Sequence, residues 1–599
     1  MRKFQITFFC FTVLAVGHVH AQEASSYRLR QIARIVQEKL HPPVNSPFRK
    51  LTEKETSQSS GEHVISMSAP ESEVDAAINP TDSNNMVVGD MELNLTGLQM
   101  PLYYTKNFGS TWVRNSFRPA PYDPQASVLG GGDPVFAYDA NGKLYMTWID
   151  LYTEGTFDTI HTGMYWAFST NGGQTWVRPS KGYVGTGWIA LNSGSQATSG
   201  IDDKEWITVD RSHSPYRNTL YVAWTHVDPG NNAVMVRRKL PGVDSMLPAV
   251  QVSSNDFKAV QYTSLGVDSK GGLHVTFMGT LDTLNYALYQ VYSSDGGATF
   301  GPAVKISDAD IPGTSADAVA NGDVIFGIRA PGNYPCPHLS IDTAVTGNLY
   351  EVWNALGIDS DEQHGTDIYF SRSTDNGMTW SVPTVINNDT VTGYTDHFYP
   401  SIAVDGKGKI SITWYDRRED PYNQIGRYYI AQSTDQGNTW TNSPVAKQPM
   451  DFNHVMDVNA NFGIGEYTQV LAAPGTTIPI WTDGRDDAGN LRIYSAFLPA
   501  GNAGVERLLT ISDNFSLFDN YPNPFRAQTK VGFQLTQPSH VRLFITDVAG
   551  KDIQTLLDGN APAGENDFTF DGSSLANGVY YLNLITDSGA ARVAMTHIR

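Results

Sequence analysis

Short aromatic segments recur along the chain, and a polar residue follows each of them. In "MTWID", "TWYD" and "IWTD" that residue is an aspartate, namely Asp150, Asp416 and Asp483. Arg418 and Arg485 each lie two residues beyond one of these aspartates. Paired carboxylates can act as the acid and the base of glycoside hydrolysis, and an arginine can bind a carboxylated sugar through two parallel hydrogen bonds. These residue types therefore predict a sugar-handling site, provided that the fold brings them together.

A second set of polar residues, which includes Lys204, stands where the preceding strands of the same segments begin. Many carboxylates near one axis would raise some pKa values, or would require arginines or a cation. We expect the acid and the base among Asp133, Asp203, Asp416 and Asp483. We expect substrate contacts from Arg418, Arg485, His338, Tyr399, Glu466 and Tyr467. The alternative is structural, because an aspartate after a strand commonly ties off a turn.

The elements that must position these residues form an internal repeat. A strand, a Gly/Asp/Asn turn and a second strand with an aromatic or apolar anchor occur seven times, at Val88, Trp148, Trp224, Phe277, Trp353, Trp414 and Trp481. The first and last anchors are six steps apart, so the mean spacing is about 65 residues. This spacing predicts an all-β, seven-bladed β-propeller, with six blades as the alternative if one hairpin is an insertion. Because an open edge strand is a liability, we expect His63 to Ser68 to supply the outer strand of the last blade.

An eight-residue motif, Ser/Thr-x-Asp/Asn-x-Gly-x-Thr-Trp/Phe, follows five of the seven hairpins. The copies read "TKNFGSTW", "STNGGQTW", "SSDGGATF", "STDNGMTW" and "STDQGNTW". The third residue can accept N–H bonds from its own turn, the glycine can supply a positive φ, and the aromatic residue can fill the space between blades. The motif falls between the third and fourth strands, at the face opposite to the polar residues. We therefore interpret it as a structural turn.

These motifs resemble the Asp boxes of the sialidase superfamily of propellers, which includes sialidases, xyloglucanases and sortilin-type receptors. In that superfamily the box is a turn away from the active site. The resemblance implies a propeller, but a sialidase also needs three arginines for the substrate carboxylate, a Tyr–Glu nucleophilic pair and an Asp acid/base. Its first arginine usually belongs to an F/Y-R-I-P motif before the first box. This chain has no such motif there, and "IRAPG", with Arg329, lies in mid-chain.

Two functional hypotheses follow from these residues. The first is an extracellular glycoside hydrolase of the exo-sialidase-like kind. The second is a non-catalytic propeller that binds a glycan or a protein through the face that carries these same polar residues. Whether the chain is an enzyme stays open at this point, because the arginine triad and the F/Y-R-I-P motif are not found.

The N-terminal segment predicts export. Residues 1–21 combine a basic start, a short apolar core and small residues near the end, which is typical of a secretory signal peptide. Residues 22–61 predict an amphipathic helix and a linker, and residues 62–500 hold the propeller. Cys336 is then the single cysteine of the mature chain, and we expect it to pack as a small hydrophobe. A net charge of −20 disfavours nucleic acid and anionic membranes, and no transmembrane segment is expected after the signal.

The C-terminal segment predicts a linker over residues 501–517 and a small β-sandwich over residues 518–599, because alternating apolar residues fall in short runs between turns. Within it, "NYPNPF", "DVAGK" and "GVYYLNL" resemble the sorting domain of the Bacteroidetes type IX secretion system. That resemblance implies contact with the secretion machinery and a protein that is released or attached to the outer-membrane surface. The alternative is a carbohydrate-binding sandwich.

Two expectations concern ligands. The expected partners are an extracellular glycan or glycoprotein and, through residues 518–599, the secretion machinery. No cofactor is expected. The Asp-rich stretch "SDADIPGTSADAVANGD" could hold a structural Ca²⁺, but it lacks the ligand spacing of a calcium loop, so a solvated loop is the first interpretation.

Overall fold

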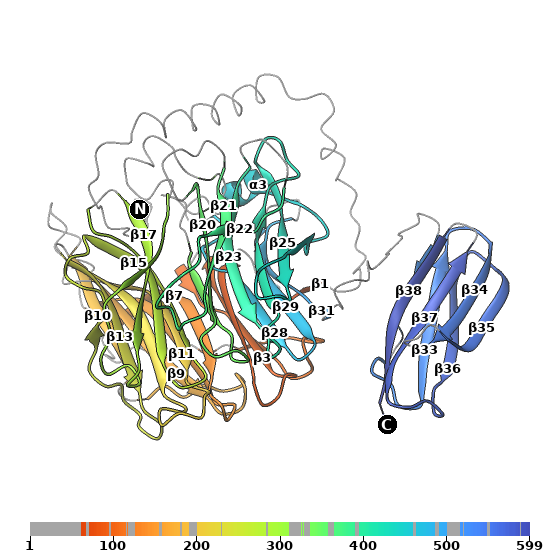
Figure 1. Cartoon of the computed structure of the whole chain (residues 1–599), viewed down its shortest axis with the longest axis horizontal. Helices are drawn as coiled ribbons and strands as arrows, with labels where there is room; N and C mark the ends of the chain where they lie inside the picture. The colour runs from red at the N-terminus through yellow and green to blue at the C-terminus, as the bar shows by residue number, and fades with distance from the viewer. Residues whose placement is uncertain are drawn as a thin grey trace, which may run out of the picture. The chain divides into compact units, whose positions relative to one another are not determined.

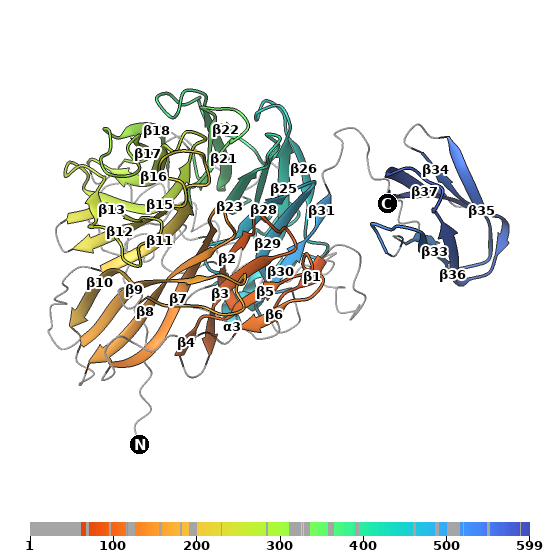
Figure 2. The ribbon, with the colours of Figure 1, turned by 90° about the horizontal axis from the view of Figure 1, so that it is seen from below.

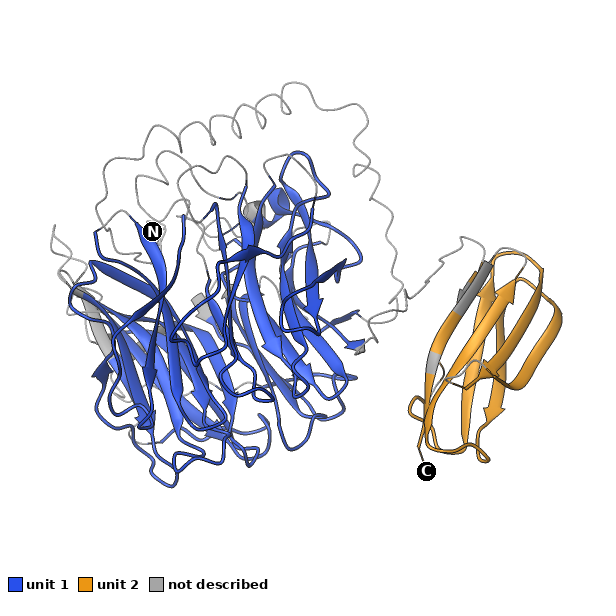
Figure 3. Ribbon diagram, in the orientation of Figure 1, with its two compact units in different colours: residues 1–500 blue, residues 501–599 orange. Residues whose placement is uncertain are grey.

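In the computed structural model the chain forms two compact units, residues 1–500 and residues 501–599 (Figure 3). The structure describes residues 62–66, 71–94, 97–115, 117, 126–154, 159–179, 182–190, 201–228, 231–282, 285–310, 325, 328, 336–357, 365–389, 395–458, 463–485, 490–499, 515–518, 520, 522–547, 551–586 and 589–598. The expected signal peptide (1–21), the expected N-terminal helix and linker (22–61) and most of the second linker lie outside these residues.

The first unit consists of antiparallel sheets that follow one another along the chain, each with a path of four strands (Figures 1 and 2). We call them blades 1 to 7. Blade 1 contains β2 (Glu71–Ile78), β3 (Met86–Asn94), β5 (Leu102–Thr105) and β6 (Val113–Asn115), with β4 (Gly97–Gln99) beside β3. Blade 2 contains β7 (Ala126–Tyr138), β8 (Leu144–Glu154), β9 (Thr159–Ser169) and β10 (Tyr183–Ala190). Blade 3 contains β11 (Ile201–Val209), β12 (Leu220–Asp228), β13 (Asn231–Lys239) and β14 (Val250–Gln251).

The remaining blades repeat this order. Blade 4 contains β15 (Ala259–Val267), β16 (Leu273–Thr280), β17 (Tyr286–Ser293) and β18 (Val304–Asp308). Blade 5 contains β19 (His338–Ile341), β20 (Leu349–Ala355), β21 (Asp367–Ser373) and β22 (Thr384–Val385). Blade 6 contains β23 (His397–Val404), β24 (Ile410–Asp416), β25 (Ile425–Ser433) and β26 (Thr441–Pro444), with β27 (Met450–Asp451) beside β25. Blade 7 contains β28 (Gln469–Ala473), β29 (Thr476–Asp483), β30 (Arg492–Ala496) and β1 (Glu62–Val64), with β31 (Leu498–Pro499) beside β29.

The first strands of the blades form a closed ring. Each contacts the first strand of the next blade, and β28 of blade 7 contacts β2 of blade 1. The seven predicted hairpins thus become seven sheets, an arrangement consistent with a seven-bladed propeller. A single helix, α3 (Phe452–Val458), occurs among the described residues, and none there is long and apolar enough to cross a membrane.

The ends of the propeller pair as predicted. Strand β1 lies antiparallel to β30, with His63 opposite Ser495 and Val64 opposite Tyr494. The segment from His63 therefore supplies the outer strand that blade 7 would otherwise lack, which confirms that prediction. Closure through the chain ends leaves β30 paired on both sides and removes an exposed edge.

The anchor residues fill the spaces between blades. Trp148, Trp353, Trp414 and Trp481 are among the largest fully buried side chains of the protein. One core cluster, for example, joins Tyr350 and Val352 of blade 5 to Trp414 of blade 6. Because successive side chains of a strand point to opposite faces, a blade that is covered on both sides contributes to two such cores.

The eight-residue motifs are the turns that were predicted. In each, the hydroxyl of the first residue accepts the N–H of the fifth residue, a glycine whose φ lies between +77° and +89°. In the copy at Ser373, Asp375 accepts both the N–H and the hydroxyl of Thr379, at 2.9 and 2.6 Å. The side chain of Trp380 then reaches Gln290 of blade 4, 3.2 Å away. The motif therefore ties one turn and contacts the neighbouring blade.

The second unit contains two small sheets around one core. One sheet contains β32 (Phe515–Leu517), β33 (Gln528–Leu535) and β36 (Gly564–Asp571), and the other contains β34 (Ser539–Thr546), β35 (Asp552–Ala561), β37 (Gly578–Thr586) and β38 (Gly589–His597). Phe533 of the first sheet and Leu543 and Leu582 of the second are fully buried in the same cluster. The alternating apolar residues of the tail thus pack the two sheets against each other.

Candidate functional site

One residue of each blade lies at the same place on the inner wall of the propeller. In blades 1 to 6 it is a non-glycine residue with a left-handed backbone, φ between +41° and +57°: Glu73, Asp133, Lys204, Tyr262, Cys336 and Tyr399. In five of these blades it falls where the register between the first two strands shifts, as in a β-bulge. A left-handed conformation costs a residue with a Cβ about 1–2 kcal/mol.

Tyr467 occupies the corresponding place in blade 7. The hydroxyl of the next residue, Thr468, donates to the carbonyl of Tyr399 at 3.2 Å, just as Thr263 donates to the carbonyl of Lys204 at 3.2 Å. We call the space inside the closed ring of first strands the channel, and we call these seven residues the channel ring. Glycine is needed just before it in blade 7, because a Cβ on Gly465 would come within 2.4 Å of the backbone nitrogen of Glu73.

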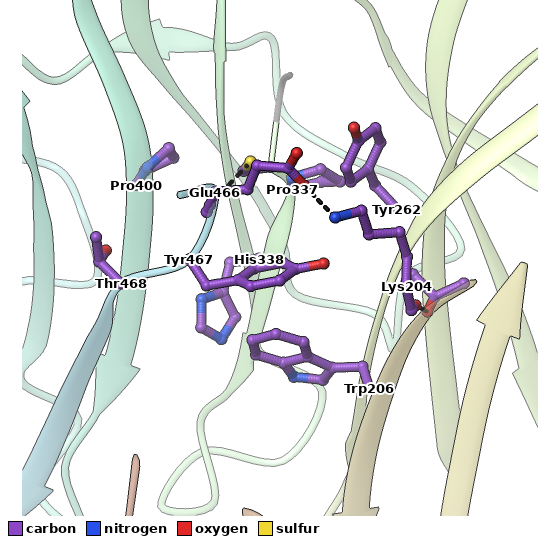
Figure 4. Close-up of a pocket in the computed structure, with 11 residues that line it drawn as sticks. Lys204, Trp206, Tyr262, Pro337, His338, Pro400, Glu466, Tyr467 and Thr468 are labelled. Atoms are coloured by element: carbon purple, nitrogen blue, oxygen red, sulfur yellow. Dashed lines mark hydrogen bonds and ion pairs between the residues drawn. The ribbon is translucent and has the colours of Figure 1, made fainter. Parts of the chain in front are cut away.

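A pocket of about 30 Å³ lies inside the closed ring of first strands (Figure 4). Its lining consists of Lys204, Trp206, Tyr262, Thr263, Cys336, Pro337, His338, Pro400, Glu466, Tyr467 and Thr468. These residues come from blades 3, 4, 5, 6 and 7, and four of them belong to the channel ring. This volume has room for about two water molecules, so only part of a larger ligand could enter it.

A buried ion pair crosses this pocket. The Lys204 ammonium donates to Oε2 of Glu466, and the exposed fractions of the two side chains are 5% and 0%. The dashed line in Figure 4 marks this contact above the ring of Tyr467, whose centroid lies 4.9 Å from Lys204 Nζ. Blades 3 and 7 are not neighbours, so the pair links the two sides of the channel. The pair also neutralises the cation that lines the pocket.

Three other titratable groups of the pocket, His338, Cys336 and Tyr467, have pKa shifts that favour their neutral forms near pH 7. Burial lowers the pKa of His338 to about 4, which leaves an uncharged imidazole. Burial, and next the charge of Glu466, raise the pKa of the Cys336 thiol well above its ordinary value. That thiol is 9% exposed and donates to the carbonyl of Glu466 at 3.3 Å, which confirms that Cys336 is packed inside the fold. Burial also raises the pKa of Tyr467, so its phenol keeps its proton.

Beside the pocket, Glu205 forms an acidic group together with Asp133 and Asp203. Glu205 is 1% exposed, and neither of its carboxylate oxygens has a hydrogen-bond partner among the described residues. Burial, and next the charge of Asp133, raise its pKa well above the ordinary value, which favours the protonated form of Glu205. Asp133 and Asp203 are half-buried. The charges of two of the expected acid/base residues thus act on one buried carboxyl group.

The other two expected acid/base residues, Asp416 and Asp483, bond to buried tryptophans. Trp414 donates its indole N–H to Asp416 at 2.7 Å, and Trp481 donates to Asp483 at 2.8 Å. Trp148 and Asp150 make the same contact at 3.0 Å. Asp416 and Asp483 also accept the backbone N–H of Arg418 and Arg485 at 2.9 Å, which is the turn-tying role that the sequence allowed for an aspartate at a strand end. A catalytic role for Asp416 and Asp483 stays a prediction.

The expected substrate-binding arginines also have carboxylate partners. Arg418 donates to Asp416 at 2.7 Å, and Arg485 donates to Asp483 at 2.6 Å. Burial opposes ionisation of Asp416, but the charge of His397 and the Arg418 contact outweigh it and lower the pKa to about 2. Arg417 is fully buried and donates to the carbonyl of Asn423 at 2.8 Å. These arginines belong to blade 6 and the strand ends of blade 7, and the pocket lining includes none of them.

Of the remaining expected residues, His338, Glu466 and Tyr467 line the pocket, and Tyr399 belongs to the channel ring next to Pro400. Sequence reasoning missed Glu73, Trp206, Tyr262 and Glu205. One signal could have pointed to the ring: a proline directly follows the ring residue in three blades, at Pro134, Pro337 and Pro400. No group of three or more His, Cys, Asp or Glu side chains that could hold a metal ion occurs in the described part of the chain.

Comparison with solved structures finds several distant propellers. The GH93 α-L-arabinofuranosidase of Fusarium graminearum, in complex with arabinobiose, is 14% identical with a TM-score of 0.36, over 64% of this chain and 95% of that one. A Hadza microbial sialidase is 12% identical with a TM-score of 0.36, over 67% and 73%. A PL25 ulvan lyase is 10% identical with a TM-score of 0.39, over 74% and 98%. No curated protein matches the chain in sequence.

The C-terminal tail has a specific match. Residues 519–594 match the family described as secretion system C-terminal sorting domain. The matched segment covers β33 to β37 and most of β38, which are the strands that build the core of the second unit. The tail of this chain is therefore a secretion-system C-terminal sorting domain of the type IX kind, and the protein is exported to the cell surface or the exterior.

Proposed function

We propose that this exported protein binds an extracellular glycan at the pocket inside the channel ring. The observation that carries the proposal is the aromatic lining around the Lys204–Glu466 ion pair. The ring of Trp206 lies 5.8 Å from that of Tyr467, inclined by 51°, and 5.3 Å from that of His338. Aromatic walls with a few convergent polar groups are typical of small-molecule sites, and aromatic faces pack well on the apolar face of a sugar.

The test is calorimetric titration of the purified full chain with a panel of neutral, amino and acidic oligosaccharides. We expect Trp206→Ala to weaken binding at least tenfold. Trp440→Ala is the matched control, since this tryptophan packs on Phe370 at the turn of the blade 6 motif and lines no part of the pocket. Absence of binding to every oligosaccharide would overturn the proposal, as would unchanged affinity in Trp206→Ala.

Hydrolysis of the bound glycan is a second candidate function, and the acidic group beside the pocket favours it. Burial raises the pKa of Glu205 and favours its protonated form, whereas Asp133 and Asp203 are partly exposed. An acid and a carboxylate held in different protonation states are the groups that glycosidases use as general acid and as base or nucleophile. We therefore propose Glu205 as the general acid and Asp133 and Asp203 as the carboxylates that act as base or nucleophile, with Asp416 and Asp483 as the less favoured pair.

Release of reducing sugar from the same panel tests this second function. Asp133→Asn and Asp203→Asn should abolish release while the dissociation constant changes little. Asp416→Asn and Arg485→Ala should instead lower the melting temperature, because they break the tryptophan–aspartate–arginine contacts. Glycan binding without release of reducing sugar would contradict the hydrolase hypothesis and would show that the protein is a binding module.

A further inference from the structure

We infer that the channel ring is strained in order to present its side chains to a sugar unit that carries neither a carboxylate nor a sulfate. This inference rests on the proposed glycan binding and specifies the class of glycan. It has two parts. The strained backbone indicates that the side chains are needed, and the charges around them indicate which ligand they can accept.

Glycine would relieve the steric strain in the backbone of the channel ring. A left-handed φ is free of steric cost only without a Cβ, and a fold that needed the bend alone would place glycine there. The chain does so at the fifth position of its five Asp-box turns, where all copies are glycine. The six left-handed ring positions instead carry acidic, basic, phenolic and thiol side chains. Strain retained with varied polar side chains is the pattern expected of a binding surface.

Four of these side chains line one pocket. Lys204, Tyr262, Cys336 and Tyr467 come from four different blades and meet around it. Electrostatics connects two of the other three, because Glu73 acts on the pKa of Cys336, and Asp133 acts on that of Tyr467. The third, Tyr399, directly precedes Pro400, which lines the pocket. The bend in each first strand thus places one side chain per blade on a common inner surface.

The charges of this surface disfavour an acidic ligand. Lys204 is the cation that lines the pocket, and Glu466 already neutralises it. Glu73, Asp133 and Asp203 add negative charge near the channel, and the pairing of Arg418 and Arg485 with Asp416 and Asp483 neutralises those cations. A carboxylate or sulfate would meet repulsion, and among the described residues that line the pocket Lys204 is the single cation that could compensate for it. Sugar hydroxyls, in contrast, can donate to carboxylates and exchange hydrogen bonds with the phenols.

Two substitutions at one position test the strain. Asp133 is half-buried and has a left-handed backbone (φ +55°), so glycine and alanine at this position separate the backbone strain from the side chain. Asp133→Gly should melt higher than Asp133→Ala by about 1–2 °C, because only glycine relieves the left-handed backbone. Both should lose at least tenfold in glycan affinity. The matched control is Gln436→Gly, an exposed left-handed residue (φ +61°) in the turn of the blade 6 motif, which should leave affinity unchanged.

The glycan panel tests the ligand class in the same full chain. We expect binding of neutral or amine-bearing oligosaccharides, and no binding of polygalacturonate, sialyllactose or sulfated glycans. Binding of acidic glycans alone would overturn this inference and leave the proposed function standing. No binding at all would overturn both. If Asp133→Gly kept wild-type affinity, or melted no higher than Asp133→Ala, the role of the strained ring would be wrong even with a glycan bound.

Discussion

Val88 of blade 1 stands where blades 2, 6 and 7 carry a tryptophan, and it leaves Asp90, two residues on, without an indole partner. In blades 2, 6 and 7 the aspartate two residues after the tryptophan accepts the indole N–H at 2.7–3.0 Å. Asp90 is fully buried, and neither of its oxygens has a hydrogen-bond partner among the described residues. Burial, and next the charges of Glu71 and Glu92, raise its pKa well above the ordinary value.

Replacing Asp90 should therefore stabilise the protein at neutral pH. An acid with a raised folded-state pKa contributes its stability below the unfolded pKa and loses it as pH rises. Asp90→Asn should raise the free energy of unfolding at pH 7, by at most about 4 kcal/mol, and flatten its decline between pH 4 and pH 7. Urea unfolding at several pH values measures this. Asp150→Asn is the control, which should not stabilise because Trp148 already donates to Asp150; equal effects in both variants would contradict the explanation.

The Lys204–Glu466 pair should behave as a coupled unit. Lys204→Met or Glu466→Gln alone leaves one buried group without its partner and should cost about 3–5 kcal/mol. The double variant Lys204→Met/Glu466→Gln should cost clearly less than the sum of the two, because it removes both charges. Chemical unfolding of wild type, the two single variants and the double variant gives the four free energies of unfolding that this double-mutant cycle needs. Strict additivity would show that the contact across the channel contributes nothing.

The raised pKa of His397 predicts a loss of stability with rising pH in a higher range, above the ordinary histidine value. Its ring nitrogens lie 3.2 Å from Asp416 and 3.3 Å from Asp389. Burial opposes its charge, but the two aspartates outweigh burial and raise its pKa to about 10. A raised histidine pKa stabilises fully below the unfolded value, near 6.5, and this contribution is lost as pH rises toward 10. Wild type should lose stability over that interval, by at most about 5 kcal/mol.

The matched comparison for this pH effect is His397→Gln, which cannot carry the charge. Its free energy of unfolding should be lower than that of wild type at pH 6 and should change little up to pH 10. Parallel pH curves for the two proteins would show that the histidine charge is not what stabilises this part of blade 6.

The Asp-box turns should affect stability and leave ligand binding unchanged. Asp375→Ala removes the acceptor of Thr379 and of the Ser373 hydroxyl, and should cost about 1–2 kcal/mol. The glycan affinity of the folded variant should equal that of wild type. Differential scanning calorimetry and titration of the same sample check both statements. A loss of glycan affinity without a loss of stability would show that the Asp-box turn takes part in ligand binding.

Much of the architecture could be read from local sequence signals. The turn residues of the Asp boxes, the hairpin anchors and their spacing act over a few residues, and they predict seven repeated sheets. The pairing of His63 with Ser495 follows from the need to close an edge. The tail could also be predicted from the sequence, because its motifs "NYPNPF" and "GVYYLNL" lie within the matched sorting domain.

The candidate site depended on what the closed ring brings together. The sequence by itself determined that polar residues would gather at strand starts and ends, and it named His338, Glu466 and Tyr467. The bonds of Asp416 and Asp483 to tryptophans are local, because each tryptophan lies two residues earlier in the same strand. Only the tertiary structure decided that Lys204 meets Glu466 across the channel, and that the ring residues take a left-handed backbone. The physical reason is that a left-handed bulge and a contact between distant blades have no local signature. Both exist only once seven blades fix the inner strands around one axis.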